Sequence, residues 1–140
     1  MIPPHAYIPG QTARHPDALF DPLKQDVTAG LTPESLSKTT CFKTGLAYLE
    51  SGYFWEAHEL FEPVWMVLPE GSHERQFVQA LIQLANGRLK VQMGRDNAAR
   101  KLGGIVVALC DGIDQATVMG CQVEEISEAG TALLNRKLEL

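Results

Sequence analysis

The chain has 140 residues, which is enough for one domain of ordinary size and too few for two well-developed cores. Apolar residues make up 45% of the chain and charged residues 21%, a composition that excludes wholesale disorder. The net charge of −5 at pH 7 excludes general binding to nucleic acid, because an acidic protein repels a polyanion, so we expect a small-molecule or protein partner instead.

The first 30 residues are expected to form an extended N-terminal arm. Five of the eight prolines fall within residues 1–22, together with the turn-forming pair Pro9-Gly10, so a continuous helix cannot form there. The arm also carries apolar side chains that suit docking against a folded body, namely Tyr7, Ile8, Leu19, Phe20 and Leu23. We therefore expect a proline-rich arm, residues 1–30, that docks on the rest of the chain.

Residues 31–140 are expected to fold as one helical domain. The first predicted helix starts after Thr32, which caps it, and ends near Gly52. Four more helices are predicted, over about residues 53–68, 72–93, 96–111 and 122–137, and no alternating strand pattern competes with them. Apolar residues cover more than half the circumference of the third helix, so this helix should be central. The predicted fold is an all-α, single-domain bundle of about five helices.

The fourth predicted helix contains two consecutive glycines, Gly103 and Gly104. Glycine inside a helix costs about 1 kcal/mol relative to alanine, so a pair of glycines needs a compensating reason. Close packing against a neighbouring helix is the reason that we expect.

The stretch of greatest chemical interest is residues 53–65, in the second predicted helix. His58 and Glu62 are four positions apart, so their side chains meet on one face, inside the apolar arc of the helix. Because an unpaired carboxylate is costly in apolar surroundings, a buried, hydrogen-bonded His58–Glu62 couple is expected. Glu59 borders the arc, Glu56 lies near its exposed side, and Pro63 is expected to kink the helix beside the couple.

The third predicted helix carries a polar strip that includes Gln79 and Gln83, whereas Arg88 falls inside its apolar arc. A guanidinium in such a place needs an anionic partner, and Glu62 or Glu59 of the preceding helix are the expected ones. The candidate ligand-binding residues are therefore Trp65, Gln79, Gln83 and Arg88.

Residues 52–65 carry the string Glu-x-His-Glu-x-x-Glu-x-x-Trp, and residues 74–85 and 94–102 follow it. In these segments the chain resembles the domain-of-unknown-function family numbered 309. The resemblance implies a small all-helical bundle of unassigned biochemical role, found mostly in prokaryotes, and some members are labelled metal-dependent hydrolases. The family motif falls here on Glu56, His58, Glu59, Glu62, Trp65, Gln79 and Gln83. Pro63, where members usually have an acidic residue, and Arg88, where smaller residues are common, depart from the family pattern.

Three interpretations of the His58 region are open. In the first, His58 and Glu62 have the spacing of metal ligands, and a divalent metal takes a further ligand from His73, His15 or Glu59. In the second, a metal-free acid/base site is formed by Glu56, His58, Glu59 and Glu62, with Gln79 and Gln83 orienting a substrate. In the third, a buried polar network fixes how the second and third predicted helices dock, and its members are His58, Glu62, Gln79, Gln83 and Arg88.

The leading hypothesis is a helical bundle that binds a ligand or partner at this His/Glu/Gln cluster. The alternative is a metal-dependent hydrolase that uses His58 and Glu62, so whether the protein is an enzyme stays open.

The cysteines and the apolar segments bear on cellular location. Three cysteines without a Cys-x-x-Cys pair fit free thiols in a reducing cytoplasm. The N-terminus lacks the features of a signal peptide, and the longest apolar run, residues 105–110, is too short to cross a membrane. We expect a cytoplasmic protein without a membrane span, and a homodimer if aromatic side chains at the ends of the second predicted helix are exposed.

Overall fold

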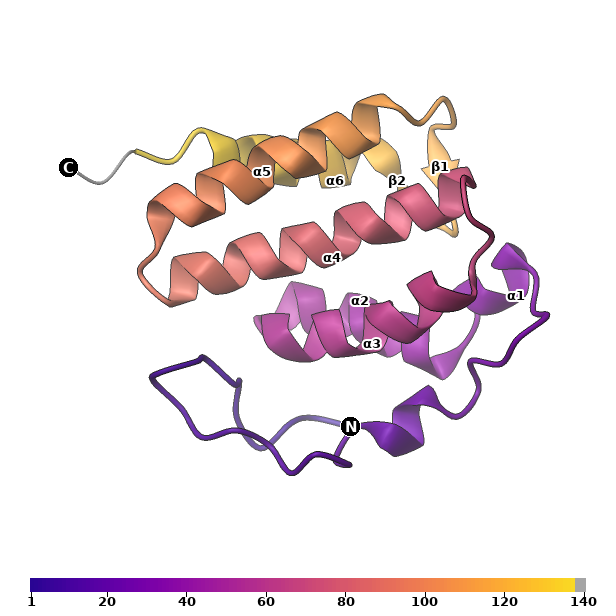
Figure 1. Ribbon diagram of the computed structural model, residues 1–140, viewed down its shortest axis with the longest axis horizontal. Helices are drawn as coiled ribbons and strands as arrows, with labels where there is room; N and C mark the ends of the chain where they lie inside the picture. Colours follow the sequence, from indigo (N-terminus) through magenta and orange to yellow (C-terminus); the bar gives the residue numbers. More distant parts are fainter. Residues whose placement is uncertain (138–140) are drawn as a thin grey trace.

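The computed structural model describes residues 1–137 and is helical almost throughout (Figure 1). Its elements, in chain order, are the 3-10 helix η1 (Asp21–Lys24), α1 (Pro33–Ser37), α2 (Thr40–Ser51), α3 (Phe54–Val67), α4 (His73–Gln92), α5 (Asp96–Asp111), β1 (Thr117–Val118), β2 (Cys121–Gln122) and α6 (Val123–Leu134). The all-α bundle is confirmed. No helix in the described part of the chain is long and apolar enough to span a membrane.

Helix α4 is the centre of the bundle, as predicted for the third helix. It packs against α3 on one side and α5 on the other, while α2 completes the first layer and α6 the second. Figure 1 shows α4 between the α2–α3 pair and the α5–α6 pair. Its buried positions cover more than half of its circumference, namely Phe77, Val78, Ala80, Leu81, Ile82, Leu84, Ala85, Gly87 and Leu89. A helix with apolar residues over most of its circumference must be covered on several sides, and α4 is.

The first predicted helix is divided in two. Thr32 caps α1 by accepting the N–H of Ser35, as expected, but α1 ends after five residues. The backbone of Thr39 is then extended, and its side chain accepts the N–H of Phe42 as the cap of α2. Asp26 adds its carboxylate to the same helix start, where Oδ2 accepts the N–H of Thr40 at 2.5 Å.

A short hairpin precedes the last helix, and the sequence pattern did not reveal it. Strand β1 pairs antiparallel with β2, with Val118 opposite Cys121. The two turn residues, Met119 and Gly120, both have positive φ angles, of 50° and 80°, as a two-residue hairpin turn requires. Strands of two residues each are too short to show an alternating pattern. Helix α6 then ends at Leu134, earlier than the predicted residue 137.

The N-terminal arm lies against α2 and α3. Phe20 is 3% exposed and belongs to the hydrophobic core. At the start of the arm, the hydroxyl of Tyr48 donates to the carbonyl of Met1 at 2.8 Å. Gln11 donates to the carbonyl of Gln92, at the end of α4, at 2.9 Å. Apart from η1, the arm follows the irregular path that its prolines predict, and Leu19, Phe20 and Leu23 dock as expected.

Deleting residues 1–30 is expected to lower the melting temperature by about 4–12 °C. Burial of an aromatic side chain such as Phe20 contributes about 2–3 kcal/mol, and 1 kcal/mol corresponds to about 2–4 °C in a chain of this size. Differential scanning calorimetry of the full chain and the truncated chain measures the difference. Equal melting temperatures would show that the docked arm contributes nothing to stability.

The three thiols are free in the structure, with Cys41 and Cys110 buried and Cys121 half-buried. Burial raises the pKa of Cys41 to about 12 and the pKa of both Cys110 and Cys121 to about 11, and nearby carboxylates add to the rise. A raised pKa keeps the thiol protonated, and the thiolate is the form that reacts.

We therefore expect iodoacetamide at pH 8 to alkylate the folded protein at least about 100-fold more slowly than the protein in urea. The rate for the folded protein should rise about tenfold per pH unit up to pH 10, because each unit increases the thiolate fraction tenfold. Mass spectrometry of quenched samples measures both rates. Similar rates in the folded and unfolded protein would contradict the shifted pKa values.

Candidate functional site

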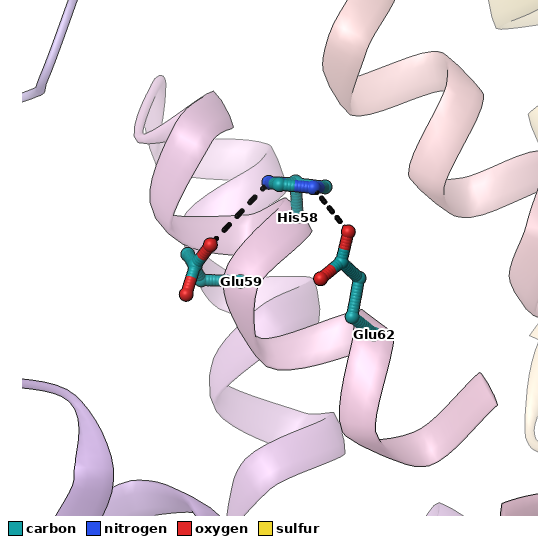
Figure 2. Close-up of side chains that lie close together, drawn as sticks. All are labelled: His58, Glu59 and Glu62. Atoms are coloured by element: carbon teal, nitrogen blue, oxygen red, sulfur yellow. Dashed lines mark hydrogen bonds and ion pairs between the residues drawn. The ribbon is translucent and has the colours of Figure 1, made fainter. Parts of the chain in front are cut away.

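The predicted couple between His58 and Glu62 forms on the surface of α3. The ring atom Nε2 of His58 lies 2.6 Å from Oε1 of Glu62, one helical turn further along. The other ring nitrogen, Nδ1, lies 4.0 Å from Oε1 of Glu59. Figure 2 shows the imidazole between the two carboxylates, one toward each nitrogen. Two neighbours on the same helix thus orient the ring, and the spacing of four residues between His58 and Glu62 accounts for their contact.

The expected burial of the couple is wrong. The side chain of His58 is 20% exposed and that of Glu62 is 50% exposed. A helical wheel gives the direction in which a side chain points, but not how far the neighbouring helix extends over it. Here a cleft lies between α3 and α4, so the carboxylate of Glu62 keeps contact with water.

Replacing His58 or Glu62 with alanine is expected to change the free energy of unfolding by no more than about 1 kcal/mol, because an exposed ion pair contributes about 0–1 kcal/mol. A buried couple would lose several times as much. Urea denaturation of the two variants and the parent protein measures the difference. A loss above 2 kcal/mol in both variants would show that the couple is a structural element after all.

The cleft has a volume of about 410 Å³ and lies between α3 and α4. Its walls bring together five of the predicted site residues, namely His58, Glu62, Trp65, Gln79 and Gln83. Three further residues line it that sequence reasoning did not single out as site residues: Met66, Ile82 and Asn86. Met66 is 69% exposed, an unusual exposure for a large apolar side chain beside a cleft. Met66 directly follows Trp65 in the sequence, and this position could have indicated that Met66 lies beside the cleft.

Glu56 lies away from this cleft. Its side chain is fully buried, and Oε2 accepts the backbone N–H of Tyr7 at 2.8 Å and lies 2.6 Å from Nε2 of His15. The rings of Phe20 and Trp55 surround the imidazole of His15, with centroids 5.2 and 6.0 Å away. The sequence placed Glu56 near the exposed side of the helix, and the docked arm reverses this. Glu56 therefore serves the docking of the arm rather than the cleft.

Arg88 is also outside the cleft, and its predicted pairing with Glu62 or Glu59 is wrong. Its Nη1 donates to the carbonyl of Leu49 at 3.5 Å, and its guanidinium carbon lies 5.9 Å from the ring centroid of Phe54. Burial lowers the pKa of Arg88, and the charge of Glu50 opposes that shift. The end of α2, not the carboxylates of α3, thus satisfies this guanidinium.

His58, Glu59 and Glu62 can each offer one ligand atom, and these three atoms lie within 4.8 Å of one another. Of the three residues considered as a third metal ligand, Glu59 is therefore the one that the structure brings to His58. In a tetrahedral zinc site, ligand atoms at about 2.1 Å from the ion lie about 3.4 Å apart. Because the two carboxylates face opposite ring nitrogens, one of them must turn before a single ion can contact all three residues. Lys24 holds Glu59 in its present direction at 3.4 Å.

One comparison with known proteins found a match, and it covers the cleft. The family model described as Domain of unknown function (DUF309) matches residues 42–102. The comparisons with curated proteins and with solved structures gave no match. The matched segment begins in α2, ends in α5 and contains every residue that lines the cleft. Residues 42–102, and with them both walls of the cleft, are thus similar to the DUF309 family, as the sequence resemblance indicated.

Proposed function

We propose that the cleft between α3 and α4 binds a small planar ligand that carries a cationic group. The observation that carries the proposal is the meeting of the His58–Glu62 couple with Trp65, Gln79 and Gln83 around one cleft. Its volume of about 410 Å³ lies within the range of small-molecule sites.

The charge of the ligand follows from the lining. Glu62 is the carboxylate in the cleft, and among the described residues no lysine or arginine lines it. Oε1 of Glu62 is engaged with His58, while Oε2 accepts no hydrogen bond from another described residue. An amidinium or guanidinium group can donate to this oxygen in a charge-assisted hydrogen bond. His58 then acts as a support that holds the carboxylate toward the cleft.

The shape of the ligand follows from the remaining walls. Trp65, Met66 and Ile82 offer apolar surface, and a flat ring packs well against an indole. Gln79, Gln83 and Asn86 lie on successive turns of α4, and each amide can both donate and accept a hydrogen bond. A planar group with polar edges satisfies both kinds of wall.

Benzamidine, benzamide and benzoate test the proposal, because the three molecules have nearly the same shape but are cationic, neutral and anionic. The chain has two tryptophans, so the indole N–H signals in ¹⁵N spectra report on two places. Trp65 lines the cleft, whereas Trp55 packs against Tyr7 in the arm, with ring centroids 5.3 Å apart. Benzamidine should shift the Trp65 signal, leave Trp55 unchanged and bind at least about tenfold more tightly than benzoate.

Glu62→Gln should remove the preference for benzamidine, whereas Glu59→Gln, which does not alter the lining, should keep it. Equal binding of benzamidine and benzoate, or a shift confined to Trp55, would refute the proposal.

A second candidate function, a divalent metal site, rests on the three donor atoms of His58, Glu59 and Glu62. A cation held there would supply a Lewis acid beside the cleft, which is the chemistry of a metal-dependent hydrolase. Metal analysis of protein purified without a metal-affinity tag, and thermal shifts with Zn²⁺, Mn²⁺ and Ni²⁺, test this function. His58→Ala should abolish a metal-dependent shift, and His73→Ala should not.

Glu59→Gln separates the two candidates, because it removes a metal ligand and leaves the lining of the cleft intact. Less than about a tenth of an equivalent of metal, with no thermal shift, would exclude the hydrolase.

A further inference from the structure

A second cleft, of about 390 Å³, continues the first one along α3 and α4. Trp65 and Gln79 line both clefts, so the two are halves of one groove. The second half is lined in addition by Glu70, which precedes α4, by Arg75 and Gln76 of α4 and by Leu109 of α5. A ligand that occupies the first half can therefore extend past the Trp65 side chain into the second.

The two halves differ in charge, because the first holds the carboxylate of Glu62 and the second holds the guanidinium of Arg75 beside the exposed carboxylate of Glu70. Glu62 lines the first half, and the guanidinium of Arg75 lies over the ring of Trp65 in the second, 4.1 Å from the ring centroid. Arg75 has five N–H donors on its guanidinium, and its one ion pair among the described residues is with Glu70, at 3.7 Å. Because the side chain of Glu70 is 93% exposed, this pair is weak and a ligand anion can replace it.

Trp65 sets the distance between the two charges. Glu62 precedes Trp65 by three residues, which is about 4.5 Å along α3, and Arg75 lies on the indole ring itself. The two anchors are therefore on the order of 10 Å apart. Between them, the amide of Gln79 faces both halves of the groove and can bond to a polar group in the middle of a ligand.

We infer that the groove binds an extended zwitterion, with its planar cation at Glu62 and a carboxylate at Arg75. The inference rests on the proposed function, because it places the cation in the same cleft. It adds a second anchor, Arg75, and a defined distance between the two charges of the ligand. A compact cation such as benzamidine does not reach the second anchor.

Three dipeptides test the inference in the wild-type protein. Acetyl-Arg-Gly with a free carboxylate carries both charges, separated by about 10 Å when extended. The same peptide with a C-terminal amide carries only the cation, and acetyl-citrulline-Gly carries only the carboxylate. Titration calorimetry should show the first peptide binding at least about fivefold more tightly than either of the others.

Arg75→Gln should reduce that ratio between the acid and the amide to about one, with the affinity for the amide within twofold of wild type. Arg75→Lys, which keeps the charge, should retain part of the ratio. If wild-type protein binds the acid and the amide equally while it still binds benzamidine, the second anchor is refuted and the first cleft stands. If it binds neither the peptides nor benzamidine, both proposals fail.

Discussion

Replacing Glu56 with alanine is expected to lower the free energy of unfolding by about 3–5 kcal/mol, because two hydrogen bonds to a buried carboxylate are lost together. The carboxylate is fully buried and lies 2.6 Å from His15. Its removal leaves the buried imidazole of His15 and the half-buried N–H of Tyr7 without their acceptor. Urea denaturation followed by circular dichroism measures the loss.

Glu59→Ala is the matched control, because Glu59 lies on the same helix, three residues further along. Its side chain is 28% exposed and its partner, Lys24, is 3.4 Å away and also partly exposed. This substitution should cost less than about 1 kcal/mol. A loss for Glu56→Ala no larger than that for Glu59→Ala would mean that the pair with His15 does not hold the arm.

Glu56→Gln adds a second measurement, because it keeps an oxygen that can accept the N–H of Tyr7. We expect it to lose about 1–3 kcal/mol, less than the alanine variant. Binding of benzamidine to the Glu56→Gln variant should equal wild type while the protein is folded, because Glu56 does not line the cleft. A changed affinity for benzamidine would show that Glu56 contributes to the binding site.

The parts of the fold that could be predicted from the sequence depend on neighbours along the chain. Thr32 caps α1 and Ser72 caps α4 through hydrogen bonds to residues three positions later. Gly52 ends α2 with a φ angle of 89°, a conformation that glycine adopts at little cost. The His58–Glu62 contact follows from the same local geometry, since both residues are on one helix.

The contacts that could not be predicted join residues that are far apart in the sequence. His15 reaches Glu56 across 41 positions, and no spacing rule relates the two residues. Asp26 likewise reaches the start of α2, so the break between α1 and α2 has part of its cause outside the helices themselves. The partner of Arg88 was misjudged because the wheel of α4 does not tell whether α2 or α3 covers that position.

The sequence predicted that close helix packing explains the glycine pair of α5. The structure shows that this reason applies to Gly103 and not to Gly104. A Cβ atom on Gly103 would lie 2.6 Å from the carbonyl oxygen of Gly130 and 2.7 Å from the backbone nitrogen of Leu134. These atoms belong to α6, so the backbones of the two helices meet at Gly103. Gly104 faces less crowded space, since its Cβ would lie 3.6 Å from Cδ1 of Leu134, an ordinary contact.

Gly103→Ala is therefore expected to lower the free energy of unfolding by about 2–3 kcal/mol, because backbone atoms cannot move aside and α5 must separate from α6. Gly104→Ala should instead raise it by about 0.5–1 kcal/mol, since alanine favours the helix and meets no obstacle. The denaturation midpoints of the two variants and the parent protein measure these effects. The two midpoints should shift in opposite directions, although the substitutions are the same and the positions are adjacent. Stabilisation by both alanines would show that the backbones of α5 and α6 do not meet at Gly103.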